Sequence, residues 1–169
     1  MLQNSELLES LELLERLYTD APTKASLLHS KHALLELCGW IEEAQDAIVK
    51  GCAQKLLDDE EIEWIAQKIE DNHHFKVGNF KNLISLVIGL NKYKEVHSNL
   101  SSTGLKYLPM IAAINSLVKP RNSHAHTHFE EARPMSKTLQ SPSVLRQEAL
   151  KIYEGFCELE EALRSNELI

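Results

Sequence analysis

Long apolar runs are missing from this 169-residue sequence. Its two most apolar stretches, LISLVIGL and MIAAINSLV, are far shorter than the roughly 18 residues that a membrane-spanning helix requires. The first residues carry glutamates in place of the basic start of a secretory signal, at Glu6, Glu9, Glu12 and Glu15. We therefore expect no membrane segment and no secretory signal. The length is typical of one domain, here residues 1–169.

Cysteine is also scarce, and several chemical motifs are absent. Cys38, Cys52 and Cys157 are odd in number, widely spaced and set among leucines. This pattern indicates buried thiols of a reducing compartment, the cytoplasm, and not a disulfide framework. The chain has no nucleotide-binding glycine loop, no Ser-His-Asp arrangement and no zinc-binding cysteine pair. These absences leave kinases, serine hydrolases and zinc fingers without support, and we expect no cofactor.

Negative charge is plentiful but unevenly distributed. The net charge of −7 disfavours a large non-specific nucleic-acid surface. Residues 1–71 hold sixteen acids and six bases, a net of −10, whereas residues 72–169 hold nine acids and twelve bases, a net of +3. An anionic ligand is therefore expected in the second part. The first part is either a solvated helix surface or a docking face.

Apolar residues recur at helical spacing along the chain, and no run of alternating β-branched residues predicts a strand. The pattern predicts an all-α, up-down bundle of about five to six helices. An N-terminal helix is expected within residues 1–20 and a core bundle over residues 24–165. The longest helix is expected over about 24–57, followed by helices in DDEEIEWIAQKIED, FKNLISLVIGL, LKYLPMIAAINSLVK and the last stretch from residue 142 onward.

Boundary signals and tryptophans add detail to this expectation. Asn79 is expected to cap FKNLISLVIGL, and Ser141 to cap the last helix with Pro142 at its first position. NKYKEVHSNLSSTG and FEEARPMSKTLQ are rich in polar residues and are interpreted as loops. Trp40 and Trp64 stand at helical positions and are expected in the core or in an interface.

Titratable side chains are concentrated in KPRNSHAHTHF, residues 119–129, directly after a predicted core helix. Arg121 and His126 fit an R-x4-H pattern, with Asn122 after the arginine. His124 and His128 are four residues apart, so on a helix they would share a face and could ligate a transition metal. No cysteine stands at a ligand spacing nearby, and a structural or exposed role is the alternative for both histidines. We predict no metal site.

Three stretches, ELCGWIEEAQDAIV, NFKNLISLVIGLNKY and RNSHAHTHF, occur in this order and together resemble the HEPN superfamily. The resemblance is to its RiboL-PSP or MAE-type branch and covers roughly residues 30–165. It implies a HEPN-like helical fold and dimerisation around the R-x4-H motif. It also implies metal-independent endoribonuclease activity of the kind found in toxin–antitoxin or anti-phage defence systems, although other HEPN proteins only bind or scaffold.

The resemblance also implies roles for individual residues of the motif. Catalysis falls to Arg121, His126 and Asn122, and substrate binding to His124, His128 and Lys119. An imidazole can exchange a proton near neutral pH, and a guanidinium can bind two phosphoryl oxygens. The RNA itself supplies the nucleophile, its 2′-hydroxyl. HEPN sites often receive an acidic residue from an earlier helix, which here would be Glu42 or Glu43, and a surface role is the alternative for each.

A straight helix would not bring Arg121 and His126 to one ligand, because residues five apart differ by about 140° in direction. Either the segment after Pro120 is non-helical, or a second copy completes the site across a two-fold axis. The second alternative predicts a homodimer with a composite active site. Besides RNA, an antitoxin protein is an expected partner. His128 stands where a subset of HEPN toxins carries a tyrosine that is AMPylated, so an antitoxin would have to act differently.

Two other functions fit the same residues. A HEPN-like module could bind RNA or a protein partner without cutting it. A helical adaptor would make the histidine cluster incidental, with Arg121 capping the end of a helix and His126 satisfied by the backbone. RNA cleavage without metal would separate the nuclease from both.

Overall fold

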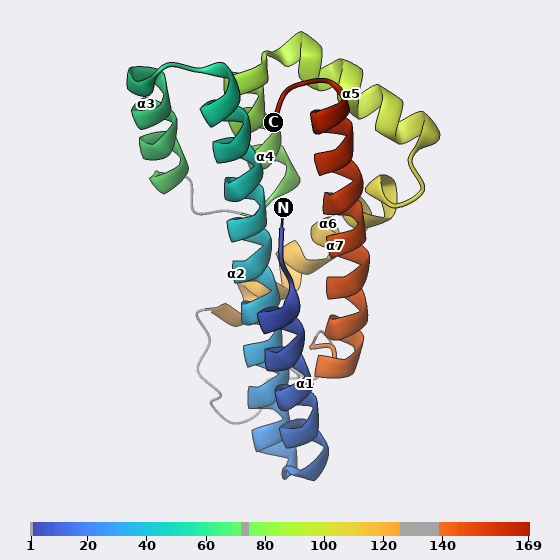
Figure 1. Cartoon of the computed structure of the whole chain (residues 1–169). Helices are drawn as coiled ribbons and strands as arrows, with labels where there is room; N and C mark the ends of the chain where they lie inside the picture. The colour runs from blue at the N-terminus through green and yellow to red at the C-terminus, as the bar shows by residue number, and fades with distance from the viewer. Residues whose placement is uncertain (1, 72–74, 126–138) are drawn as a thin grey trace.

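The computed structural model describes residues 2–71, 75–125 and 139–169, and within these ranges the chain is all-α and forms no strand (Figure 1). The all-α prediction is confirmed. The helices are α1 (Ser5–Asp20), α2 (Thr23–Leu56), α3 (Asp59–Glu70), α4 (Val77–Ile88), α5 (Leu90–Thr103), α6 (Tyr107–Ala125) and α7 (Pro142–Ser165). The described part thus contains seven helices, so the expected number of about five to six was too low.

The additional helix is α5, which occupies a segment that the sequence predicted to be a loop. Gly89 separates α4 from α5 with a φ of 81°, a conformation that glycine adopts without steric cost. After this break, Tyr93, Val96 and Leu100 are buried at helical spacing. Burial of this apolar face outweighs the low helix propensity of the serines and asparagines between them.

The structure agrees with the predicted start of α7 but not with that of α4. Pro142 is the first residue of α7 and Ser141 precedes it as the N-cap residue, although the Ser141 hydroxyl contacts the Ser143 hydroxyl at 2.9 Å and caps no amide. The prediction that Asn79 caps α4 was wrong. The N-cap position of α4 is occupied by Lys76, so Asn79 lies inside the first turn.

α2 is the longest helix and runs along the length of the molecule, with α1 and α7 beside it (Figure 1). Cys38 and Cys52 are buried on it, as predicted, whereas Cys157 of α7 is half-buried. Trp40 packs against the core through its contacts with α7, but Trp64 on α3 is 47% exposed and is not a core residue. The buried apolar residues of α2 therefore face the core of the bundle.

The first turn of α6 is held by a side chain of α7. The Glu158 carboxylate accepts hydrogen bonds from the backbone N–H groups of Leu105, Lys106 and Tyr107, at N···O distances of 2.9, 2.9 and 2.7 Å. Desolvation raises the pKa of this carboxyl, but the three hydrogen bonds and the Lys106 cation lower it, and the net pKa lies below its ordinary value. An anion at this position also complements the positive end of the helix dipole. Glu158 thereby positions the helix whose far end carries the motif.

α6 and α7 are in close contact at Gly155. A Cβ added to this buried glycine would lie 2.3 Å from the Cβ of Met110 and 2.9 Å from the carbonyl oxygen of Lys106. A backbone atom cannot move away as the end of a flexible side chain can. The absence of a side chain at Gly155 is therefore what lets the two helices pack at this distance.

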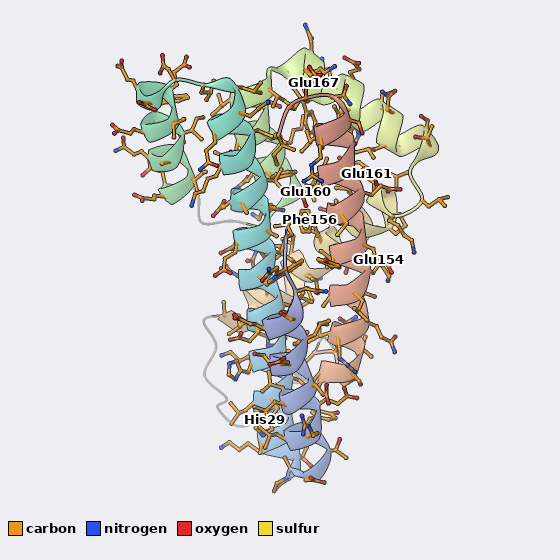
Figure 2. All side chains as sticks on the ribbon, viewed as in Figure 1. His29, Glu154, Phe156, Glu160, Glu161 and Glu167 are labelled. Atoms are coloured by element: carbon orange, nitrogen blue, oxygen red, sulfur yellow. The ribbon has the colours of Figure 1, made fainter. Side chains whose placement is uncertain are left out.

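α7 has one side that faces α2 and another side that faces away from it. Phe156 and Glu160 lie on the side of α7 towards α2, whereas Glu154 and Glu161 lie on the other side (Figure 2). The buried Glu160 carboxylate binds the Arg164 guanidinium at 2.9 Å. The exposed polar side of α7, with Glu154 and Glu161, is typical of a helix in a water-exposed bundle. No described helix is both long enough and apolar enough to cross a membrane.

Candidate functional site

α6 continues through the first half of the motif. It remains helical past Pro120 as far as Ala125. Proline has no N–H, so the carbonyl of Ser116, four residues earlier, receives no hydrogen bond from this position. The non-helical alternative for the segment after Pro120 is therefore wrong for residues 121–125. His126 and His128 lie outside the described residues.

Arg121 extends from α6 to α2, where it meets Glu42. The Nη2 atom of Arg121 lies 3.8 Å from Oε1 of Glu42, and the two side chains are 26% and 28% exposed. This Glu42 oxygen is enclosed and accepts no hydrogen bond within the described ranges, because 3.8 Å exceeds hydrogen-bonding distance. The contact is thus a loose, partly buried ion pair. It leaves the guanidinium with N–H donors that can bind an anion.

Glu42 and Glu43 are neighbours in sequence but lie on different faces of α2. Consecutive helical residues differ by about 100° in direction. Glu42 faces α6, whereas Glu43 is exposed and lines a hollow beside α1 together with Glu6 and Trp40. Of the two acidic candidates that the sequence could not separate, the structure places Glu42 beside Arg121. A supporting role for Glu42 in catalysis stays a prediction.

Cys38 lies one turn before Glu42, and the charges of Arg121 and Glu42 both affect its pKa. Its side chain is buried, and burial raises the pKa of the thiol to about 12. The Arg121 cation opposes this rise and the Glu42 carboxylate adds to it. Because a group with such a pKa is a thiol at neutral pH, Cys38 is not an activated nucleophile. The buried Cys38 near Arg121 is therefore chemically inert.

His124 is buried at the end of α6, although the sequence predicted that it binds substrate. Only 2% of the residue is exposed. Burial lowers the pKa of the imidazole and the nearby Lys31 cation of α2 lowers it further, so the ring is neutral at pH 7. In this structure the His124 ring is enclosed near α2. Substrate binding by His124 stays a prediction, and it would require the ring to become uncovered.

Lys119 and Asn122 occupy the solvent side of α6. Both residues are exposed, and three positions along a helix place them on nearly the same face. Asn122 differs from Arg121 by about 100° in direction, so the amide and the guanidinium do not project together. The structure therefore brings Arg121 and His124 to α2 and leaves the other two predicted residues facing solvent.

Two residues near the motif were missed by the sequence analysis. The Lys31 cation of α2 lowers the pKa of His124, and Cys38 of α2 lies near enough to Arg121 for that cation to lower the pKa of its thiol. They share a helix face with Glu42, and helical periodicity counted back from Glu42 could have found them. Nothing in the sequence shows which polar face of α2 meets α6, and that information was needed first.

We call the described residues around Arg121 the Arg121 cluster, namely Glu42, Lys119, Arg121, Asn122 and His124. This cluster supplies a cation for an anionic ligand but no accessible group that titrates near neutral pH. Within the described ranges, no group of three or more His, Cys, Asp or Glu side chains could hold a metal ion. Comparisons with protein-family models, with curated proteins and with solved structures find no match for this chain. Fold and site together define an all-α protein with an arginine-centred cluster at the junction of α2 and α6.

Proposed function

We propose that this chain is a metal-independent endoribonuclease of the HEPN type, acting in the cytoplasm in a toxin–antitoxin or anti-phage defence system. The observation that supports this most directly is the position of Arg121. Its guanidinium belongs to the R-x4-H sequence, is paired loosely with Glu42, and stays partly open to solvent. A cation in this setting suits a phosphodiester, because the donors are already oriented and partly desolvated.

The proposed reaction needs proton transfer and charge stabilisation. The 2′-oxygen of RNA attacks the neighbouring phosphorus, the bond to the 5′-oxygen breaks, and the leaving oxygen takes up a proton. His126 transfers protons, and Arg121 stabilises the negative charge that develops on the phosphoryl oxygens. Asn122 orients the phosphate, and Lys119, His124 and His128 contribute to substrate binding. The products are a 2′,3′-cyclic phosphate and a 5′-hydroxyl.

The proposed active unit is a homodimer with a composite site. Residues 121–125 are helical, which supports our proposal that a second copy brings Arg121 and His126 to one phosphate. Such a site makes a specific prediction for mixed variants. An inactive Arg121→Ala chain and an inactive His126→Ala chain should regain part of the activity when they are refolded together.

The test is cleavage of labelled single-stranded RNA in EDTA. Arg121→Ala and His126→Ala should each slow cleavage by about 100-fold to 1,000-fold, the usual loss for a group that stabilises developing charge. Arg146→Ala is the matched control, because Arg146 also pairs loosely with a carboxylate, Glu12 at 3.6 Å, but lies away from the motif. His32→Ala controls for loss of an exposed imidazole. Cleavage that survives in both motif variants would contradict the proposal.

One observation favours a second function, RNA or partner binding without cleavage. His124 is buried and neutral, and the accessible described residues of the cluster offer a guanidinium, an ammonium and an amide. Such groups bind phosphates but transfer no proton near neutral pH. In the same assay, binding that depends on Arg121 with no cleavage in the wild type would establish this function.

A further inference from the structure

A trough follows the side of α1 that faces away from the bundle core. It consists of three neighbouring hollows of about 380, 330 and 540 Å³, and Glu6 lines all of them. The first two lie between α1 and α2 and share Trp40 and Glu43, and the third follows the exposed surface of α1 as far as Arg16. On α1 itself the lining runs from Ser5 to Arg16, which corresponds to about 17 Å of helix. This is long enough to receive about three turns of another helix, at about 5.4 Å per turn.

The trough is strongly acidic. Five glutamates line it, namely Glu6, Glu9, Glu12, Glu36 and Glu43. Glu12 is compensated by Arg16 at 3.5 Å and by Arg146 at 3.6 Å, and Glu36 lies 3.1 Å from a ring nitrogen of His32. Within the described ranges, the other three glutamates form no ion pair. A row of uncompensated carboxylates attracts a basic partner and repels RNA.

Gly39 lies on the wall of the trough and has no packing reason to be glycine. A Cβ added there would meet no atom within 4 Å. Glycine inside a helix is less favourable than alanine by about 1 kcal/mol, so its presence in the middle of α2 costs stability. What the missing side chain does provide is open space between Leu35 and Trp40 in the hollow beside α1. Gly39 thus keeps a recess free where an apolar side chain can enter next to the indole.

We propose that this trough binds a basic, amphipathic helical segment of a partner protein. Lysines or arginines of the segment would face the uncompensated glutamates, and one of its aliphatic side chains would enter the recess at Gly39. The exposed Leu13 of α1 offers a further apolar contact in the third hollow. The proposal does not depend on the nuclease activity, because the trough and the Arg121 cluster lie on different faces of α2.

The test measures binding of a fluorescent synthetic peptide of about 18 residues, roughly five helical turns, with leucines on one face and lysines on the others. Two control peptides are used: one with glutamate in place of every lysine, and one with the same composition but a scrambled apolar face. The intact protein should bind the first peptide and neither control. Glu6→Gln combined with Glu43→Gln should weaken binding about tenfold, as expected for two partly screened charge contacts.

Two further variants separate a defined site from general attraction between opposite charges. Glu60→Gln combined with Glu63→Gln removes the same charge from exposed positions on α3 and should leave the affinity unchanged. Gly39→Leu fills the recess without changing the charge and should weaken binding while the protein stays folded, as circular dichroism would show. RNA cleavage serves as an independent readout and should be the same in all these variants.

Three results would overturn the proposal. Equal weakening by the α3 and trough variants would show non-specific attraction. Equal binding of the scrambled peptide would show that no helix face is recognised. Light scattering that shows self-association in the wild type, lost in Glu6→Gln/Glu43→Gln, would make a second copy of this chain the occupant.

Discussion

α6 contacts its two neighbours, α7 and α2, in different ways. Against α7 the contact is close, because Gly155 admits Met110 where any side chain would collide, and Glu158 accepts hydrogen bonds at the start of α6. Against α2, near the motif, the contact is polar and loose, with Arg121 at 3.8 Å from Glu42. One flank of the same helix is built for packing, and the other leaves a cation incompletely paired.

The difference between these two contacts indicates which flank of α6 contributes to stability and which contributes to function. A buried, close-packed contact contributes to folding and tolerates little change. A charged pair at 3.8 Å contributes little to stability, but it leaves donors that a phosphate can use. Substitutions on the α7 flank should therefore change the free energy of unfolding, and substitutions on the α2 flank should change activity.

Of three further substitutions that compare the two flanks, Gly155→Ala on the α7 flank is expected to have the largest effect. The new Cβ overlaps Met110 and the Lys106 backbone, so the free energy of unfolding should fall by about 2 kcal/mol despite the better helix propensity of alanine. Gly39→Ala is the matched control in α2, where the Cβ meets nothing and stability should rise by about 0.5–1 kcal/mol. Urea denaturation measures both. Similar values for the two variants would mean that the α6–α7 contact is not as close as described.

An intermediate effect is expected from Glu42→Ala on the α2 flank. Without its carboxylate, Arg121 loses the contact that orients it, and single-turnover RNA cleavage should slow about tenfold, or about 1.4 kcal/mol in activation free energy. Glu43→Ala is the control, because it removes the neighbouring charge from a different face of α2. Equal rates in the two variants would show that Glu42 does not position Arg121. Circular dichroism should show both chains folded.

The smallest effect is expected from Glu158→Gln at the start of α6. The amide keeps one acceptor oxygen but loses the charge, so the free energy of unfolding at pH 7 should fall by about 1 kcal/mol. The pKa of Glu158 is lowered on folding, so its contribution is present above the unfolded value of 4.5 and is lost as pH falls through the folded value. The difference between wild type and variant should therefore shrink below about pH 4.5. Glu161→Gln, on the exposed side of α7, should show no such dependence.

The residues that could be predicted from the sequence are those whose behaviour is local. The apolar stripe of α2 and the proline at the start of α7 follow from helical periodicity and from proline chemistry. α5 could not be predicted, because its polar residues resemble a loop and its helix forms only when Tyr93 and its neighbours are buried by other helices. The motif itself was visible as an R-x4-H pattern, but the helical course of residues 121–125 was not.

By itself, the sequence determined the helical class, the excess of acid in the first part of the chain and the presence of an arginine-histidine motif. The tertiary structure decided which carboxylate meets Arg121 and which histidine is buried. The physical reason is that Glu42 and Glu43 have the same chemistry and nearly the same local sequence. Only the direction from which α6 approaches α2 makes one of them a partner and leaves the other in an acidic trough.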